Sequence, residues 1–218
     1  ARCSRKAARG NGRWISISAE RGMGKSWLLQ RSEFQSYALI KCGLGVYSGT
    51  FNGKQAHSGF EEILLPVLRH TLRHKGKSEL TEILGPWGGQ LAVVFPRIQM
   101  EGYLDDCPKI ADAVSDEIGK ERVFSSVLSV LTASVEIESR LLILEDFHLA
   151  DDFDLELLRR LVIQSLELPI LLITTHRPEL GQRKSSFERL LTEIRAENQL
   201  QEIELGPFNQ AETYSMVS

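Results

Sequence analysis

The stretch between Trp14 and Leu29 constrains the fold more than any other part of the chain. It reads W-I-S-I-S-A-E-R-G-M-G-K-S-W-L-L, and this pattern predicts a buried strand over residues 14–18, a glycine-bearing turn and a helix over residues 25–35. The turn fits the phosphate-loop pattern G-x-x-x-x-G-K-[ST] through Gly24, Lys25 and Ser26, with Ala19 at the first glycine position. We therefore expect an anion-binding turn between this strand and this helix.

The residue types of the turn suit a phosphate ligand. Gly22 and Gly24 allow unusual backbone dihedrals and a close approach of the backbone to a ligand, and the unpaired N–H groups at the start of the helix face the same anion. Lys25 adds a charge for the outer phosphates, and Ser26 places a hydroxyl on Mg²⁺. The alternative is an ordinary strand-to-helix loop that contains Gly-Lys-Ser by chance.

A second informative stretch is the apolar run over residues 141–144, which ends directly in Glu145 and Asp146. A continuous apolar run is typical of a central parallel strand that is covered on both faces, and side chains at the carboxyl end of such a strand lie in the ligand crevice. Nucleotide hydrolysis needs one carboxylate in the Mg²⁺ shell and one that orients water. We assign the metal to Glu145 and the water to Asp146, although the two roles could be exchanged. The alternative is an acidic loop at a strand end.

A third apolar run, over residues 169–174, predicts another strand and ends in T-T-H-R-P. Arg177 at this end would reach the terminal phosphate and sense the nucleotide state through charge-assisted hydrogen bonds. Further strands are expected over residues 37–42 and 200–205, with a loop over residues 46–58 because that segment is rich in Gly, Ser, Asn and Gln. Helices are expected over residues 59–75, 78–84, 89–95, 120–135 and 187–195, and one more after Asp152 or Asp154 as its cap.

Because strands alternate with helices, the pattern favours an α/β fold with a parallel sheet and right-handed crossovers. In the first helix, Trp27, Leu28 and Phe34 are the expected core contacts. The chain has 218 residues and a net charge of −3, so no general attraction to nucleic acid is implied. We interpret residues 1–12 as a basic, flexible lead-in and residues 13–218 as the folded domain.

The cysteines and the apolar runs lead us to expect a reducing, cytoplasmic setting. The three cysteines are far apart, which argues against a zinc site or a disulfide framework. No apolar run is long enough to span a membrane, and no signal peptide is visible.

Four segments together resemble the AAA-like ATPase module of signal-transduction (STAND-type) P-loop NTPases, which occurs in large bacterial LuxR-type regulators and adenylate cyclases. They are I-S-A-E-R-G-M-G-K-S-W-L-L, L-L-I-L-E-D-F-H-L-A-D, L-L-I-T-T-H-R-P-E-L and I-E-L-G-P-F. The resemblance covers residues 13 to 218 approximately, and the segment with H-x-A-D is the most specific. It implies a three-layer P-loop fold with five parallel strands in the order 5-1-4-3-2, helices on both faces and a helical insertion between strands 2 and 3.

The resemblance also implies ATP or ADP with Mg²⁺ as cofactors. It places the nucleotide on the turn and the start of its helix, at Ala19, Gly22, Met23, Gly24, Lys25, Ser26 and Trp27. The metal would be held by Ser26 and Glu145, and the catalytic set would be Asp146, Glu145 and Arg177.

This sequence departs from the family pattern in three places. Ala19 replaces a glycine, Leu149 stands where the family often has tryptophan, and the family's G-R-E segment near the adenine pocket is not visible. The preference for adenine is therefore implied by the resemblance alone.

Three functions follow from this reading. The first is a nucleotide-switched regulatory ATPase within a larger signalling or transcription-regulating protein, whose lid, output domain and protein or self-association partners are expected beyond residue 218. The second is a nucleotide-binding interaction scaffold without significant turnover. The third is a replication-type AAA protein that loads on DNA, which would need a winged-helix domain; we expect no direct contact of this segment with nucleic acid.

Overall fold

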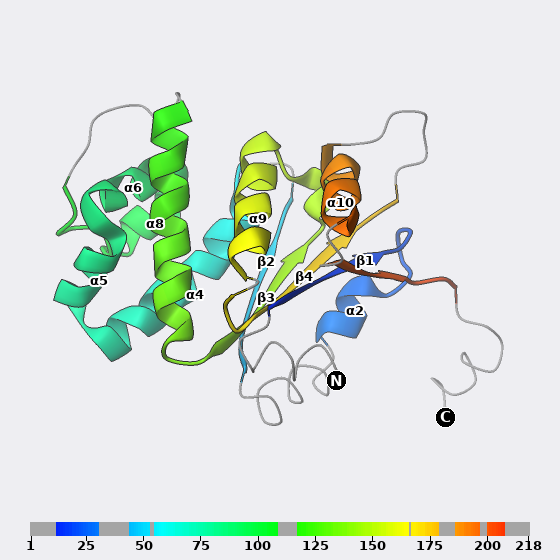
Figure 1. The fold of residues 1–218 in the computed structure, drawn as a ribbon, viewed down its shortest axis with the longest axis horizontal. Helices are drawn as coiled ribbons and strands as arrows, with labels where there is room; N and C mark the ends of the chain where they lie inside the picture. Colours follow the sequence, from blue (N-terminus) through cyan, green and yellow to red (C-terminus); the bar gives the residue numbers. More distant parts are fainter. Residues whose placement is uncertain are drawn as a thin grey trace.

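A computed structural model describes residues 12–30, 44–52, 55–108, 117–165, 167–178, 186–196 and 200–207. Its centre is a five-stranded, all-parallel sheet in the order β2-β3-β4-β1-β5 (Figure 1). The strands are β1 (Arg13–Ser18), β2 (Leu44–Thr50), β3 (Ser139–Glu145), β4 (Ile170–His176) and β5 (Leu200–Glu204). The order, read from the opposite edge, is 5-1-4-3-2, and this expectation is confirmed.

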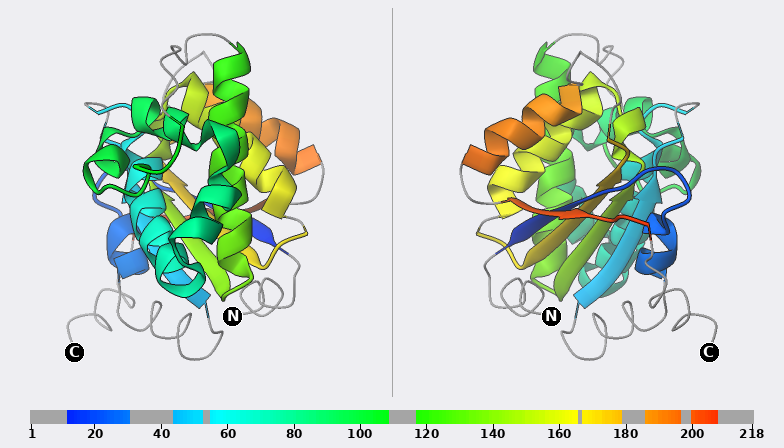
Figure 2. Two further views of the ribbon diagram at one scale, coloured as in Figure 1. Left: turned by 90° about the vertical axis from the view of Figure 1, so that its left-hand side faces the viewer. Right: turned by 90° about the vertical axis from the view of Figure 1, so that its right-hand side faces the viewer.

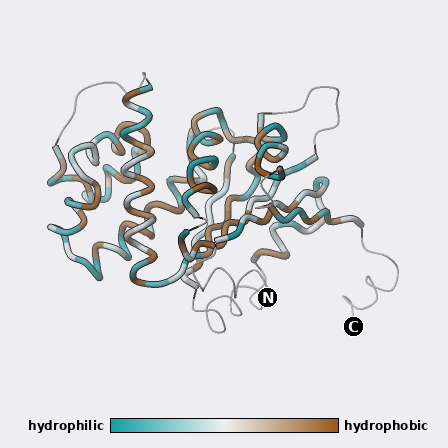
Figure 3. The backbone as a smooth tube through the Cα atoms, viewed as in Figure 1, coloured by the Kyte–Doolittle hydropathy of each residue, from teal (hydrophilic) through white to brown (hydrophobic). Residues whose placement is uncertain are grey.

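Helices cover both faces of the sheet (Figures 1 and 2). On one face lies α2 (Lys25–Gln30), and on the other lie α4 (Ser58–Lys75), α8 (Glu117–Val135), α9 (Asp152–Ser165) and α10 (Ser186–Ala196). Successive strand residues point to opposite faces, so β3 contributes Leu142 and Leu144 to the large core and Leu141 and Ile143 to a smaller core with Leu29 of α2. Apolar residues therefore run continuously along the central strands (Figure 3).

The expected helical insertion between the second and third strands is present. It consists of α4, α5 (Lys77–Leu84), the 3₁₀ turn η2 (Gly85–Gln90), α6 (Leu91–Val94), α7 (Pro96–Met100) and α8. Gly85 ends α5 with a left-handed φ of 67°. The predicted helix over residues 89–95 is wrong in its start, because the segment after Gly85-Pro86 forms the 3₁₀ turn first and becomes α-helical only at Leu91.

Strand β2 corrects the loop that the sequence predicted over residues 46–58. Its glycine and serine content suggested a loop, yet Val46 pairs with Leu141 and Gly49 with Leu144 of β3. Glycine is required at position 49 because a Cβ atom there would lie 1.9 Å from the carbonyl oxygen of Gly59 in α4. Pairing with β3 and close packing of α4 therefore make this segment a strand despite the low strand propensity of its glycines. The strand predicted over residues 37–42 lies outside the described residues.

The first helix differs from its prediction in the residue that points inward. Leu29 is buried with 2% of its surface exposed, whereas Trp27 is 46% exposed and is not a core contact. Leu28 packs at the edge of the smaller core, and Phe34 lies outside the described residues, as does the predicted lead-in up to residue 11. In the described part of the chain, no helix has the length and apolar character needed to cross a membrane.

Candidate functional site

The carboxyl ends of β1, β3 and β4 meet at a cavity of about 270 Å³. Its lining comes from the turn after β1, the start of α2 and the residues that follow β3 and β4: Arg21, Gly22, Gly24, Lys25, Ser26, Trp27, Asp146 and Arg177. Three sequence segments that were predicted separately to bind a nucleotide thus contribute to one cavity. Ligands of open α/β sheets bind at this edge of the strands.

The turn between β1 and α2 depends on two glycines in the left-handed region. Gly22 has φ 84° and Gly24 has φ 85°, values that cost a residue with a Cβ atom about 1–2 kcal/mol. Ala19, at the first glycine position of the motif, is not among the described non-glycine residues with positive φ. Its N–H donates to the carbonyl oxygen of His176 at 3.3 Å, and it is buried. An alanine therefore fits this position without backbone strain.

Lys25 lines the cavity with only 8% of its surface exposed. Its Nζ donates to the carbonyl oxygens of Ala19 at 2.6 Å and Glu20 at 3.1 Å. Burial lowers the pKa of the Lys25 ammonium; nearby Asp146 opposes this shift and Arg177 adds to it. An anion in the cavity would therefore stabilise the charged form of Lys25.

The two carboxylates after β3 occupy different positions. Asp146 lines the cavity in a left-handed conformation with φ 55°, and its N–H donates to Thr175 Oγ1 at 3.0 Å. Glu145 is 7% exposed and does not line the cavity. As the last residue of β3 it shares the parity of Leu141 and Ile143, which face α2. The structure thus brings Asp146 to the cavity lining, whereas Glu145, on the α2 side of the sheet, does not belong to that lining.

The remaining predicted residues divide in the same way. Ser26, Trp27 and Arg177 line the cavity, whereas Met23 does not and donates its N–H to the carbonyl oxygen of Glu20 at 3.4 Å. Arg21, which sequence reasoning did not assign, also lines the cavity. The lining therefore has three cationic side chains, Arg21, Lys25 and Arg177, against one carboxylate, Asp146. This imbalance favours an anionic ligand.

Sequence reasoning also missed two residues around Asp146. The hydroxyl of Thr175 accepts the Asp146 N–H, and His148 places its Nδ1 atom 4.0 Å from Asp146 Oδ1. Burial lowers the pKa of the His148 imidazole; Asp146 opposes this shift, and Arg177 and Lys25 strengthen it. The H-x-A-D segment was a signal for His148, but the sequence assigned it no role.

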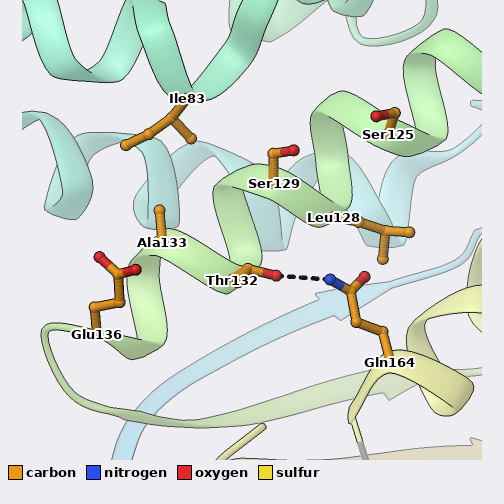
Figure 4. Close-up of a pocket in the computed structure, with 8 residues that line it drawn as sticks. All are labelled: Ile83, Ser125, Leu128, Ser129, Thr132, Ala133, Glu136 and Gln164. Atoms are coloured by element: carbon orange, nitrogen blue, oxygen red, sulfur yellow. Dashed lines mark hydrogen bonds between the residues drawn. The ribbon is translucent and has the colours of Figure 1, made fainter. Parts of the chain in front are cut away.

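Other polar clusters of the described residues lie away from this cavity. A larger cavity of about 490 Å³ lies between α5, α8 and α9, where Gln164 Nε2 donates to Thr132 Oγ1 at 2.8 Å (Figure 4). His57 Nδ1 contacts Asp154 Oδ1 at 2.9 Å and Asp151 Oδ2 at 3.6 Å. The Asp154 N–H donates to Asp151 Oδ1 at 3.0 Å, so Asp151 caps α9, and the predicted cap at Asp152 or Asp154 is wrong. These groups satisfy one another by hydrogen bonds.

No protein-family model matches this sequence, and no curated protein is significantly similar to it. The chemistry of the cavity described above is therefore the basis for a function.

Proposed function

We propose that this chain is a P-loop domain that binds ATP with Mg²⁺ and hydrolyses it slowly, as a regulatory switch within a larger signalling or transcription-regulating protein. The observation that carries the proposal is the lining of the cavity, in which Lys25 at the start of α2 and Arg177 just after β4 face the same space as Asp146. Cations from a glycine-bearing turn and from the neighbouring strand end suit a row of phosphates.

The main predicted residues take the following roles in this proposal. Lys25 and the backbone of residues 22–26 bind the outer phosphates, and Arg177 contacts the terminal phosphate. The hydroxyl of Ser26 and the carboxylate of Glu145 are hard oxygen donors of the kind that Mg²⁺ prefers, so the chemistry of these two side chains suits this ion. Bound Mg²⁺ would neutralise charge on the phosphates, and Asp146 would orient the attacking water.

One observation favours the second candidate function, a nucleotide-binding interaction scaffold without significant turnover. Glu145, the expected metal carboxylate, does not line the cavity. If it also stays out of the cavity when phosphates are bound, the chain can bind them through Lys25 and still lack a complete Mg²⁺ shell. Binding and turnover must therefore be measured separately.

The first experiment is calorimetric titration of the wild-type chain, Lys25→Ala and Lys120→Ala with MgATP and MgADP. Lys120 is a matched control, because it pairs with Glu117 on the surface of α8. We expect micromolar binding, roughly −8 kcal/mol, for the wild type and the control. The Lys25→Ala protein should bind at least about 100-fold more weakly, a loss of about 2.7 kcal/mol. Equal affinity of wild type and Lys25→Ala would sink the assignment of the site.

The second experiment separates the switch from the scaffold. In single-turnover assays, Asp146→Asn should bind ATP as the wild type does, but its rate of phosphate formation should fall by at least about 100-fold. Binding without phosphate release by the wild type would favour the scaffold.

A further inference from the structure

The carboxylate of Asp146 has no hydrogen-bond donor among the described residues, although its backbone is firmly held. The N–H of Asp146 donates to Thr175 Oγ1 at 3.0 Å, and its carbonyl oxygen accepts the N–H of Leu149 at 2.9 Å. The side chain that carries the carboxylate is 29% exposed. A group that orients water must be held in one geometry, so this carboxylate needs a partner.

His148 is the side chain placed to supply that partner. Its Nδ1 atom is buried, has no hydrogen-bond partner in the described part of the chain and lies 4.0 Å from Asp146 Oδ1. Both residues belong to one tight turn, since η3 (Phe147–Leu149) follows Asp146 directly. Phe147 anchors this turn in the core against the rings of Phe51 and Phe187, at 4.8 and 5.1 Å between ring centroids.

We propose that His148 is a positioning residue, whose Nδ1–H closes onto Asp146 Oδ1 when a nucleotide occupies the cavity. This inference rests on the proposed function of the site. A hydrogen bond requires a separation of about 3 Å, so the two side chains must approach each other by about 1 Å. Such a change is within the reach of side-chain rotation alone.

Charge explains why the approach would follow binding. Without a ligand, Asp146 lies in the field of Lys25 and Arg177, as its effect on the Lys25 ammonium shows. Phosphates would engage both cations and add negative charge beside Asp146. The neutral imidazole of His148 is a donor that the phosphates do not occupy, and it then becomes the best partner for the carboxylate.

Three variants test this role in steady-state ATP hydrolysis: His148→Ala, His148→Asn and His148→Gln. The side-chain amide of asparagine can donate from near the position of Nδ1, whereas that of glutamine donates from near Nε2. We expect His148→Ala and His148→Gln to lower kcat about 10- to 100-fold with KM within about twofold of the wild type, and His148→Asn to stay within about threefold in kcat. A purely structural role would lower the melting temperature and would not distinguish asparagine from glutamine.

A second measurement reads the contact without turnover. In ¹⁵N NMR of the MgADP-loaded chain, His148 should carry its proton on Nδ1, and Asp146→Asn should shift that resonance. The inference would be overturned if His148 of the MgADP-loaded chain carried its proton on Nε2, or if its Nδ1 resonance were the same in Asp146→Asn as in the wild type. An unchanged kcat of His148→Ala would also overturn it. Failure of the wild type to bind nucleotide would overturn the proposed function and this inference together, whereas normal binding with an inert His148 would overturn this inference alone.

Discussion

Two histidines at the carboxyl ends of neighbouring strands are kept neutral by their surroundings. His176 is the last residue of β4 and is 7% exposed, and His148 lies in the η3 turn just after β3. Burial is the main cause that lowers the pKa of His176 to about 4; repulsion from His148 in its protonated form and from Lys25 adds to this shift, and Glu202 opposes it. The Nδ1 atom of the neutral His176 ring lies 3.2 Å from Ser16 Oγ.

This neutral His176 predicts a loss of stability in mild acid. The His176 imidazole takes up a proton near pH 6.5 in the unfolded chain and only near pH 4 in the folded chain. The free energy of unfolding is therefore undiminished above pH 6.5 and falls as the pH decreases toward 4. The loss reaches at most about 3 kcal/mol. Urea unfolding between pH 7 and 4.5 should show a shallower decline for His176→Gln than for the wild type. His74→Gln, at an exposed position, should follow the wild type; identical slopes for all three proteins would contradict the prediction.

At the scale of the element, the accuracy of the sequence predictions followed the strength of the local signal. Strands β3 and β4 are continuous apolar runs buried on both faces, and the sequence located both. Strand β2 has glycine at two of its seven positions, so its strand character comes from pairing with β3 and from α4, which no local pattern encodes. The motif likewise identified Gly22, Gly24 and Lys25, whereas His148 and Thr175 acquire their positions from the turn after β3 and from β4.

The crossing of β2 and α4 gives a stability prediction. Gly49→Ala would force a methyl group to within 1.9 Å of the carbonyl oxygen of Gly59, so backbone must shift and the free energy of unfolding should fall by about 3 kcal/mol. Chemical denaturation measures the change. The control is Gly206→Ala, because a Cβ atom at Gly206 meets nothing within 4 Å, and its effect should stay within about 0.5 kcal/mol. Equal stability of the two variants would argue against this close approach.

At the scale of the whole molecule, one side-chain pair joins the helical insertion to the helix that follows β3. His57, just before α4, contacts the buried carboxylate of Asp154 in α9. Its ring also packs against Phe153 of α9 and Phe95 of the insertion, at 4.5 and 6.1 Å between centroids. Although burial acts in the opposite direction, Asp154 raises the pKa of His57. The sequence predicted both elements and offered no sign of the pair, since its members lie 97 residues apart.

A double-mutant cycle tests whether this pair holds the molecule together. His57→Ala leaves the Asp154 carboxylate buried without its ring partner and should cost about 3 kcal/mol of unfolding free energy. Asp154→Asn removes the charge, so the double variant should be more stable than the sum of the single losses predicts. Thermal and urea unfolding of the four proteins give the coupling energy. Strict additivity would mean that the two side chains act independently.

The contacts of Lys25 have a consequence for affinity. Because Nζ donates to the carbonyl oxygens of Ala19 and Glu20, the turn engages two of its three N–H groups, and a phosphate that needs more than one of them must compete with these carbonyls. If Lys25 were released for only about 1% of the time, a ligand that requires it would bind about 100-fold more weakly than its contacts allow. Any partner that drew Glu20 away from the lysine would then raise the affinity of the site without touching the ligand.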